Sequence, residues 1–185
     1  MTPPAITPTH HRTAPEPAGE IEIVRVTTDL DRTQAAVVLG EQRAWAEALL
    51  GRELAEVQPS ARYEYAFLGE FYDAPNGQLL LARVDGEPVG VIGVRRLDDE
   101  LGEGKRLYVR RSARGVGIAW RLVDELLAAA RSLGFRALYV ETWPAKTAAS
   151  YEMCRRLGFR ETAKRGFHDM DEVIAMRLPL DTVTT

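Results

Sequence analysis

The sequence predicts an α/β domain built on a mixed, mostly antiparallel sheet with helices on both of its faces. Three observations favour this fold class. Strand-like and helix-like periods alternate along the chain, and three strand-like runs follow one another between residues 78 and 110. Two amphipathic helical segments then lie on either side of a short apolar run at 137–142.

The first half begins with IEIVRVTT (21–28), whose apolar and polar residues alternate as in a half-buried strand. A helix is expected next, because Asp29 or Asp31 can cap its start and Gly51 can end it. A second helix is expected over 61–72, a segment rich in aromatic residues.

Three strands are expected to follow as a meander. The runs QLLLARV (78–84) and PVGVIGVRRL (88–97) lie on either side of Asp85-Gly86, which is a strong signal for a two-residue hairpin. DDELGEG (98–104) predicts a second turn, and KRLYVR (105–110) predicts the third strand of the meander.

The second half predicts a helix from Ile118 that Gly134 ends, and then a buried strand at 137–142. Another amphipathic helix is expected over 145–157, followed by two last strands at 159–163 and 173–180. The expected order is therefore strand, two helices, three strands, helix, strand, helix and two strands.

The two ends of the chain differ from the rest in composition. Residues 1–19 contain five prolines and few apolar side chains, which predicts a disordered Pro-rich tail. Residues 20–181 are expected to form one domain, and the residues after them a frayed end.

Composition excludes several classes of protein. The net charge of −3 gives no reason to expect a nucleic-acid partner or an anionic membrane, and no apolar run is long enough to span a bilayer. Cys154 is the single cysteine of the 185 residues, so no internal disulfide is possible and a cytoplasmic location is expected. The adjacent His10 and His11 lie in the tail, and no metal site is predicted.

The stretch RGVGIA (114–119) joins a strand to a helix start. Such a loop presents unpaired N–H groups and the positive end of the helix dipole, and glycines let phosphate oxygens come close. Neither common nucleotide loop fits. A P-loop needs Lys-Ser or Lys-Thr after Gly117, and in a dinucleotide-binding loop Trp120 would block the close approach of helix and strand.

A third pattern does fit. Arg114-x-x-Gly117-x-Ala119 matches the signature Q/R-x-x-G-x-G/A. With KRLYVRRSARG (105–115), TAASYEMCRRLGF (147–159) and LLLARVDGEPVGVIGVRRL (79–97), the chain resembles the GNAT superfamily of N-acetyltransferases over residues 21–180. It is most similar to bacterial GNAT proteins of the small-molecule type.

The resemblance implies acetyl-CoA as cosubstrate and no metal. The family's fourth and fifth strands part, the pantetheine adds to the fourth strand, and the pyrophosphate binds the amides of the loop. The residues implied in cofactor binding are Leu107, Val109, Arg110, Arg114, Gly115, Val116, Gly117, Ile118, Ala119, Thr147 and Ser150.

The implied reaction is direct attack of an amine on the thioester in a ternary complex, with the amide of Val109 as oxyanion donor. Glu103 is the preferred base, because period-two counting places it on the same side of its strand as Val109, and Glu141 is the second candidate. Cys154 stands where the family commonly has its tyrosine acid, and Tyr151 is the alternative acid.

The acceptor is expected to be the amine of a small molecule, bound by the two early helices and the loop between the last two strands, where His168 and Asp169 lie. Two alternatives stay open. The replacement of tyrosine by Cys154 would suit an inactive CoA-binding sensor, and an open pocket rim would suit a protein acetyltransferase that modifies lysines or N-termini. A homodimer is compatible with the resemblance.

Overall fold

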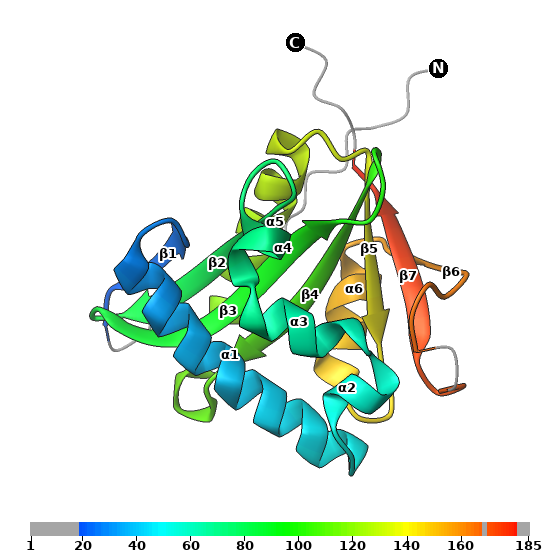
Figure 1. Ribbon diagram of the computed structural model, residues 1–185, viewed down its shortest axis with the longest axis horizontal. Coiled ribbons are helices and arrows are strands. Elements are labelled where there is room, and N and C mark those ends of the chain that lie inside the picture. The colour runs from blue at the N-terminus through cyan, green and yellow to red at the C-terminus, as the bar shows by residue number, and fades with distance from the viewer. Residues whose placement is uncertain (1–18, 168–169, 181–185) are drawn as a thin grey trace.

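The computed structural model describes residues 19–167 and 170–180 (Figure 1). The tail predicted for residues 1–19 lies outside this range except for Gly19, and so do the frayed end and the pair His168–Asp169.

The centre of the molecule is one seven-stranded sheet in the order β1-β2-β3-β4-β5-β7-β6, in which only β4 and β5 run parallel (Figure 1). This confirms the predicted α/β class and the mostly antiparallel sheet. The strands are β1 (Ile21–Arg25), β2 (Gly77–Val84), β3 (Glu87–Arg96), β4 (Leu101–Val109), β5 (Ala137–Thr142), β6 (Arg160–Thr162) and β7 (Ile174–Pro179).

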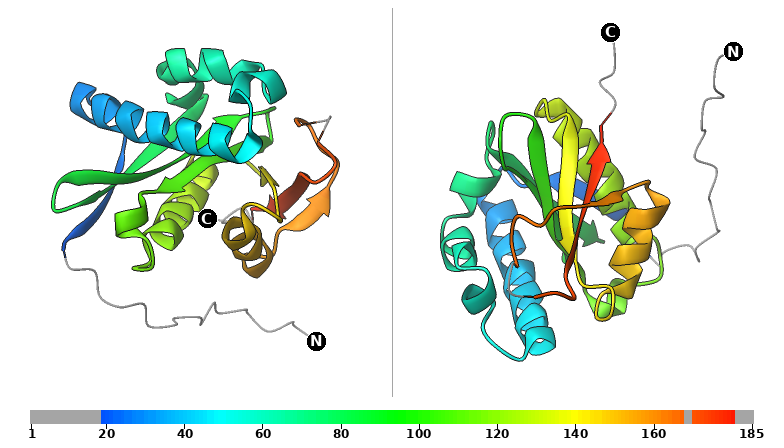
Figure 2. Two further views of the ribbon diagram at one scale, coloured as in Figure 1. Left: turned by 90° about the horizontal axis from the view of Figure 1, so that it is seen from below. Right: turned by 90° about the vertical axis from the view of Figure 1, so that its right-hand side faces the viewer.

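The helices cover both faces of this sheet. Four helices of the first half lie on one face, and the two helices of the second half lie on the other (Figure 2). They are α1 (Asp29–Leu50), α2 (Leu54–Val57), α3 (Ser60–Ala66), α4 (Leu68–Tyr72), α5 (Ile118–Ser132) and α6 (Ala148–Arg156), with a 3-10 turn, η1 (Arg111–Ala113), before α5.

Local signals explain where several of these elements end. Thr28, rather than either aspartate, is the N-cap of α1, and its hydroxyl accepts from the amide of Asp31 while the Asp31 carboxylate accepts from Thr28 in return. Gly51 ends α1 in the left-handed conformation. Asp85 and Gly86 both have positive φ, as the predicted two-residue hairpin requires.

The single helix expected over 61–72 is wrong, because the segment folds as α3 and α4 with a break at Phe67. The break follows from a buried contact. The hydroxyl of Tyr72 donates to the carboxylate of Glu64 at 2.6 Å. In a continuous helix these residues would lie about 12 Å apart along the axis, so one straight helix could not make this bond.

The predicted start of the third meander strand is also wrong. β4 begins at Leu101, so four residues of the expected turn 98–104 belong to the strand. Glycines explain why the sequence resembles a turn there. A Cβ on Gly102 would lie 2.6 Å from Phe135, and one on Gly104 would lie 3.2 Å from Leu126. Gly102 is needed because Phe135, in the turn after α5, packs closely on it, whereas a side chain at Gly104 would require Leu126 of α5 to shift by a few tenths of an ångström.

A β-bulge interrupts β4. Gly93 of β3 lies opposite Lys105 and Val91 lies opposite Tyr108, so one residue of β3 faces two of β4. Arg106 occupies the bulge with a φ of 63°. The period-two counting that placed Glu103 beside Val109 is therefore wrong. Val109 packs in the α5 cluster, whereas Glu103 lies on the α1–α4 face.

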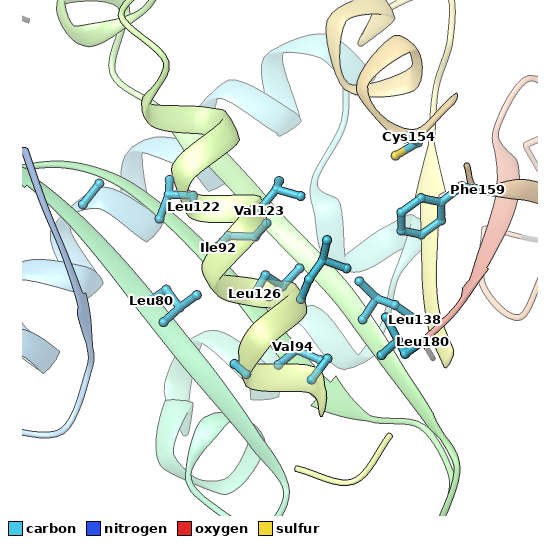
Figure 3. Close-up of a cluster of buried hydrophobic side chains, with 14 of the residues drawn as sticks. Leu80, Ile92, Val94, Leu122, Val123, Leu126, Leu138, Cys154, Phe159 and Leu180 are labelled. Carbon is cyan, nitrogen blue, oxygen red and sulfur yellow. The ribbon is translucent and has the colours of Figure 1, made fainter. Parts of the chain in front are cut away.

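The main core lies between the sheet and α5 and extends to α6. Leu80, Ile92 and Val94 of the sheet meet Leu122, Val123 and Leu126 of α5, as Figure 3 shows. Cys154 and Phe159 close the cluster on the side of α6 (Figure 3). A second cluster packs α1 and α4 on the other face of β2 and β3.

Candidate active site

A cavity of about 230 Å³ lies where β4 and β5 part. The two strands pair only through Leu101–Ala137, Gly102–Leu138 and Glu103–Tyr139, next to the bulge. Beyond these pairs the cavity reaches both faces of the sheet. Its lining combines residues of α1 and the α2–α3 region with residues of α5 and α6, among them Gln42, Trp45, Leu49, Gln58, Arg106, Leu107, Val123, Glu141, Trp143, Ser150, Met153, Cys154, Phe167 and Met170.

The glycine loop leads into α5 with its amides unengaged. Gly115 and Gly117 have φ values of 86° and 87°, and a Cβ on either would meet no atom within 4 Å. Gly117 is the N-cap of α5 and makes no side-chain cap. The hydrogen bonds among described residues include none donated by the amides of 115–119. Several N–H donors and the positive end of a 15-residue helix thus face open space, which suits a phosphate.

The amide and carbonyl of Val109 point away from strand β3, with which β4 pairs on that side. The amide of Arg110 donates to Val89 of β3, so Val109 lies at a position whose amide and carbonyl face the side of β5. Its carbonyl accepts from Nε of Arg114 at 2.8 Å. Its amide has no partner among the described residues, and is therefore available to a ligand entering between the strands.

The two predicted arginines differ in how they are held. Arg110 pairs with Glu41 of α1 through two nitrogens, at 2.7 and 2.9 Å, so its charge is largely compensated. Arg114 lies with its guanidinium 5.8 Å from the ring centre of Tyr108 and makes no ion pair with a described residue. Arg114 is thus the more available of the two for an added anion.

A buried ionic network borders the cavity on the α1–α4 face. Glu64, only 1% exposed, accepts from Nε and Nη2 of Arg106 at 2.8 and 2.9 Å and lies 2.9 Å from Nζ of Lys105. Lys105 also approaches Glu103, which pairs with Arg95 at 2.5 Å.

Burial and pairing act in opposite directions on these groups. Burial disfavours the charged form of Glu64, but hydrogen bonds and charge from Arg106, with the charge of Lys105, outweigh it and lower the pKa of Glu64 to about 2. For Lys105 burial is the largest effect, and its pKa is lowered despite the charge of Glu103.

The two candidate bases occupy different places. Glu103 is 6% exposed, is held by Arg95 and Lys105, and is not among the residues that line the cavity. Glu141 does line the cavity. Its Oε1 accepts from the hydroxyl of Tyr139 and from the amide of Gly166, while Oε2 has no hydrogen-bond partner among the described residues. Of the two carboxylates, Glu141 is therefore the one that lies at the cavity.

The candidate acids lie on α6. Cys154 lines the cavity and is 9% exposed, and burial raises the pKa of its thiol to about 11. Tyr151 packs against the main core, with Arg155 at 6.0 Å from its ring centre, and does not line the cavity.

The remaining predicted residues line the same cavity at the start of α6. The hydroxyl of Thr147 donates to the carbonyl of Trp143 at 2.9 Å and accepts from the amide of Trp143, so it fixes the loop between β5 and α6. Ser150 lines the cavity beside it.

Sequence reasoning missed three polar residues on the cavity wall or behind it. Gln42 lies in α1, Gln58 directly after α2 and Glu64 in α3, and the sequence shows no motif at any of them. Arg106 lies within the stretch KRLYVRRSARG (105–115), and nothing in the sequence indicated that a bulge would turn its side chain toward the opposite face.

Two features are absent from the part of the chain that the structure describes. No group of three or more His, Cys, Asp or Glu within 19–167 and 170–180 is arranged to hold a metal ion. In the same ranges, no helix has the length and apolar character needed to cross a membrane.

Comparison with known proteins agrees with this geometry. The model of the acetyltransferase (GNAT) family matches residues 44–159. A protein of Azospirillum brasilense named IAA acetyltransferase is 33% identical over 132 residues, which span 62% of this chain and 84% of that protein.

Solved structures show the same fold. An acetyltransferase from Streptococcus agalactiae has a TM-score of 0.68 at 18% identity, covering 86% of this chain and 98% of that one. A GNAT family acetyltransferase from Elizabethkingia anophelis with acetyl-CoA bound has a TM-score of 0.57 at 19% identity, with coverage of 86% and 98%.

Proposed function

The chain belongs to the GNAT acetyltransferase family and is an acetyl-CoA-dependent N-acetyltransferase, and from this premise we propose that it acetylates the amine of a small molecule by direct attack in a ternary complex. The observation that carries the proposal is the cavity between the parted strands β4 and β5, which reaches both faces of the sheet. Two substrates can therefore enter from opposite faces and meet between the strands.

The residues present fit acetyl-CoA. The unengaged amides of 115–119 and the dipole of α5 would hold its pyrophosphate, and the side of β4 that faces away from β3 would hold its pantetheine. When bound, acetyl-CoA supplies an acetyl thioester. The amide of Val109 is placed to donate a hydrogen bond to negative charge that develops on a carbonyl oxygen between the strands.

Glu141 is proposed as the base that takes the proton of the acceptor amine, directly or through one water. The support is its place on the cavity wall and the partner-free Oε2 described above. Glu103, the first choice from sequence, is the weaker candidate because the positive charges of Arg95 and Lys105 hold it away from the cavity.

Cys154 is a poor donor for the departing thiolate. Burial raises the pKa of its thiol to about 11, above that of a free thiol, so it gives up its proton less readily than an ordinary thiol would. Tyr151 would need to turn out of its packing against the core. We therefore propose that the thiolate leaves toward water without an obligatory side-chain acid.

A small acceptor is supported by the size and lining of the cavity, whose walls include Trp45, Trp143 and Phe167. The relative named IAA acetyltransferase is consistent with a small-molecule acceptor. None of the described lining residues favours a polypeptide over a small molecule.

The test is release of free thiol from acetyl-CoA in the presence of a panel of small amines, with a lysine peptide and an N-terminal peptide as separate arms. We expect turnover with small amines and none with the peptides. Turnover confined to a peptide would identify a protein acetyltransferase, and CoA binding without any turnover would identify a sensor.

A further inference from the structure

The wall of the cavity on the α1–α4 face is rich in hydrogen-bond donors that lack an acceptor. Arg106 is 9% exposed, and its Nε and Nη2 are bound to Glu64 and Gln58. No described residue accepts from its Nη1. Every buried side-chain nitrogen and oxygen in the described part of the chain has a partner, so Nη1 must reach open space. Because Arg106 lines the cavity, that space is the cavity.

Two glutamines add donors of the same kind. Gln58 is 9% exposed and presents Oε1 to Nη2 of Arg106 at 2.7 Å. An arginine can only donate, so the amide orientation of Gln58 is fixed and its Nε2 group is left to donate elsewhere. Gln42 is 5% exposed, and its Oε1 accepts from the hydroxyl of Tyr65 at 2.5 Å. Its Nε2 group is therefore also left to donate elsewhere. Neither Nε2 has a described acceptor, and both residues line the cavity.

These donors lie close together. Gln58 is bonded to Arg106, whose guanidinium carbon lies 5.0 Å from the ring centre of Tyr65, and Tyr65 is in turn bonded to Gln42. One arginine and two glutamine side chains thus border one part of the cavity, and what they lack is an acceptor.

The charge of the surrounding network points the same way. Among the described residues, Arg95, Lys105 and Arg106 form their ion pairs with only two carboxylates, those of Glu64 and Glu103. One positive charge is left in excess in a buried cluster, where an uncompensated charge is costly. A single excess charge and one available guanidinium nitrogen suit a monoanion better than a dianion, and a carboxylate accepts several N–H donors at once.

We propose that Arg106, Gln58 and Gln42 bind a carboxylate of the acceptor, so that the acceptor substrate is an amine that also carries a carboxylate. Trp45, Leu49 and Phe167 give the cavity apolar lining, so the part of the acceptor between its amine and its carboxylate is expected to be apolar or aromatic. This inference rests on the proposed function, because it names the class of its acceptor.

The decisive experiment measures binding apart from catalysis. Calorimetry compares 3-phenylpropionate with its neutral partner 3-phenylpropionamide, using the full chain with CoA present. We expect the carboxylate to bind at least tenfold more tightly than the amide, because a hydrogen bond to a charged group contributes more to binding than one to a neutral group.

Gln58→Glu is the matched variant, because it keeps the shape of the side chain, supplies the missing negative charge to Arg106 and repels a carboxylate. It should abolish the tenfold preference. Gln34→Glu is the control, since Gln34 also accepts from an arginine, Arg83, but does not line the cavity. It should retain the preference, and thermal melting checks that both variants fold.

A second arm measures kcat/KM for aromatic amino carboxylates and for their carboxamides, with one to four carbons between amine and acid group. A preference for the carboxylates that Gln58→Glu removes supports the inference. Equal binding of the two probes, or equal turnover of carboxylate and carboxamide acceptors, overturns it. Binding preference without any turnover would leave the carboxylate site standing and overturn the proposed function, so the two failures are distinguishable.

Discussion

The ionic network around Glu64 makes a quantitative prediction about stability. In Glu64→Gln the side chain keeps its size, and the amide oxygen can still accept from Tyr72, but Arg106 loses its ion-pair partner and Lys105 loses one of its two. Removing one member of a buried ion pair costs about 3–5 kcal/mol.

The pKa of Glu64 gives a second, independent estimate. Its value falls from 4.5 to about 2 on folding, and at about 1.4 kcal/mol per pKa unit this corresponds to about 3 kcal/mol at pH 7. Because the folded pKa is the lower one, this stability is fully present above pH 4.5 and is lost as the pH falls toward 2. At pH 3 about 1 kcal/mol should be left.

The assay is urea unfolding of the natural protein and of Glu64→Gln at pH 7 and pH 3. The difference in unfolding free energy should be about 3 kcal/mol at pH 7 and should shrink by about 2 kcal/mol at pH 3. All other carboxylates are present in both proteins, so the change in this difference reports on Glu64 together with the groups coupled to it, Lys105 and Glu103. Glu56→Gln, at an exposed position of α2, is the control and should change stability by less than about 0.5 kcal/mol at either pH. A difference that does not depend on pH would refute the argument.

Three further predictions concern the site. Gly117→Ala should weaken CoA binding by at least fivefold in calorimetry, whereas Gly134→Ala, with a similar positive φ at the other end of α5, should lose about 1 kcal/mol of stability and no CoA affinity; equal CoA affinities would show that the loop holds no phosphate. Glu141→Gln should lower kcat at least tenfold with the KM for acetyl-CoA unchanged, while the exposed Glu161→Gln should have no effect. Cys154→Ala should change kcat by less than twofold, because a thiol with a pKa of about 11 is a weak acid, and a tenfold loss would restore its role as the acid.

Sequence patterns predicted most of the fold because the signals were local. The period of α5 and the hairpin at Asp85-Gly86 depend only on neighbouring residues, and both are confirmed. The break at Phe67 was not predictable, because it depends on a bond between Glu64 and Tyr72 and on two cations from another strand. The early start of β4 was hidden for a similar reason, since Gly102 and Gly104 resemble a turn until helix α5 is seen to pack against them.

The bulge at Arg106 also explains why the site was only half predictable. Motif resemblance located the loop that would hold acetyl-CoA, because that loop is one short stretch of chain. The acceptor side is assembled from α1, from Gln58 and from β4, and it depends on a single residue with positive φ. That residue shifts the alternation of β4, so Leu107 and Val109 pack on the α5 face while Arg106 joins Glu64 on the other.

The bulge at Arg106 therefore affects both the opening between β4 and β5 and the side chain that lines the cavity. The extra residue increases the twist of β4 just beyond its last pair with β5, at Glu103–Tyr139, where the cavity opens. It also brings a guanidinium to the acceptor wall, where the surrounding charges do not fully neutralise it. A left-handed conformation in a non-glycine residue is costly, and it persists where buried contacts determine it. Here those contacts are Glu64 and Gln58, so the group that fixes the bulge is the same group that we propose selects the acceptor.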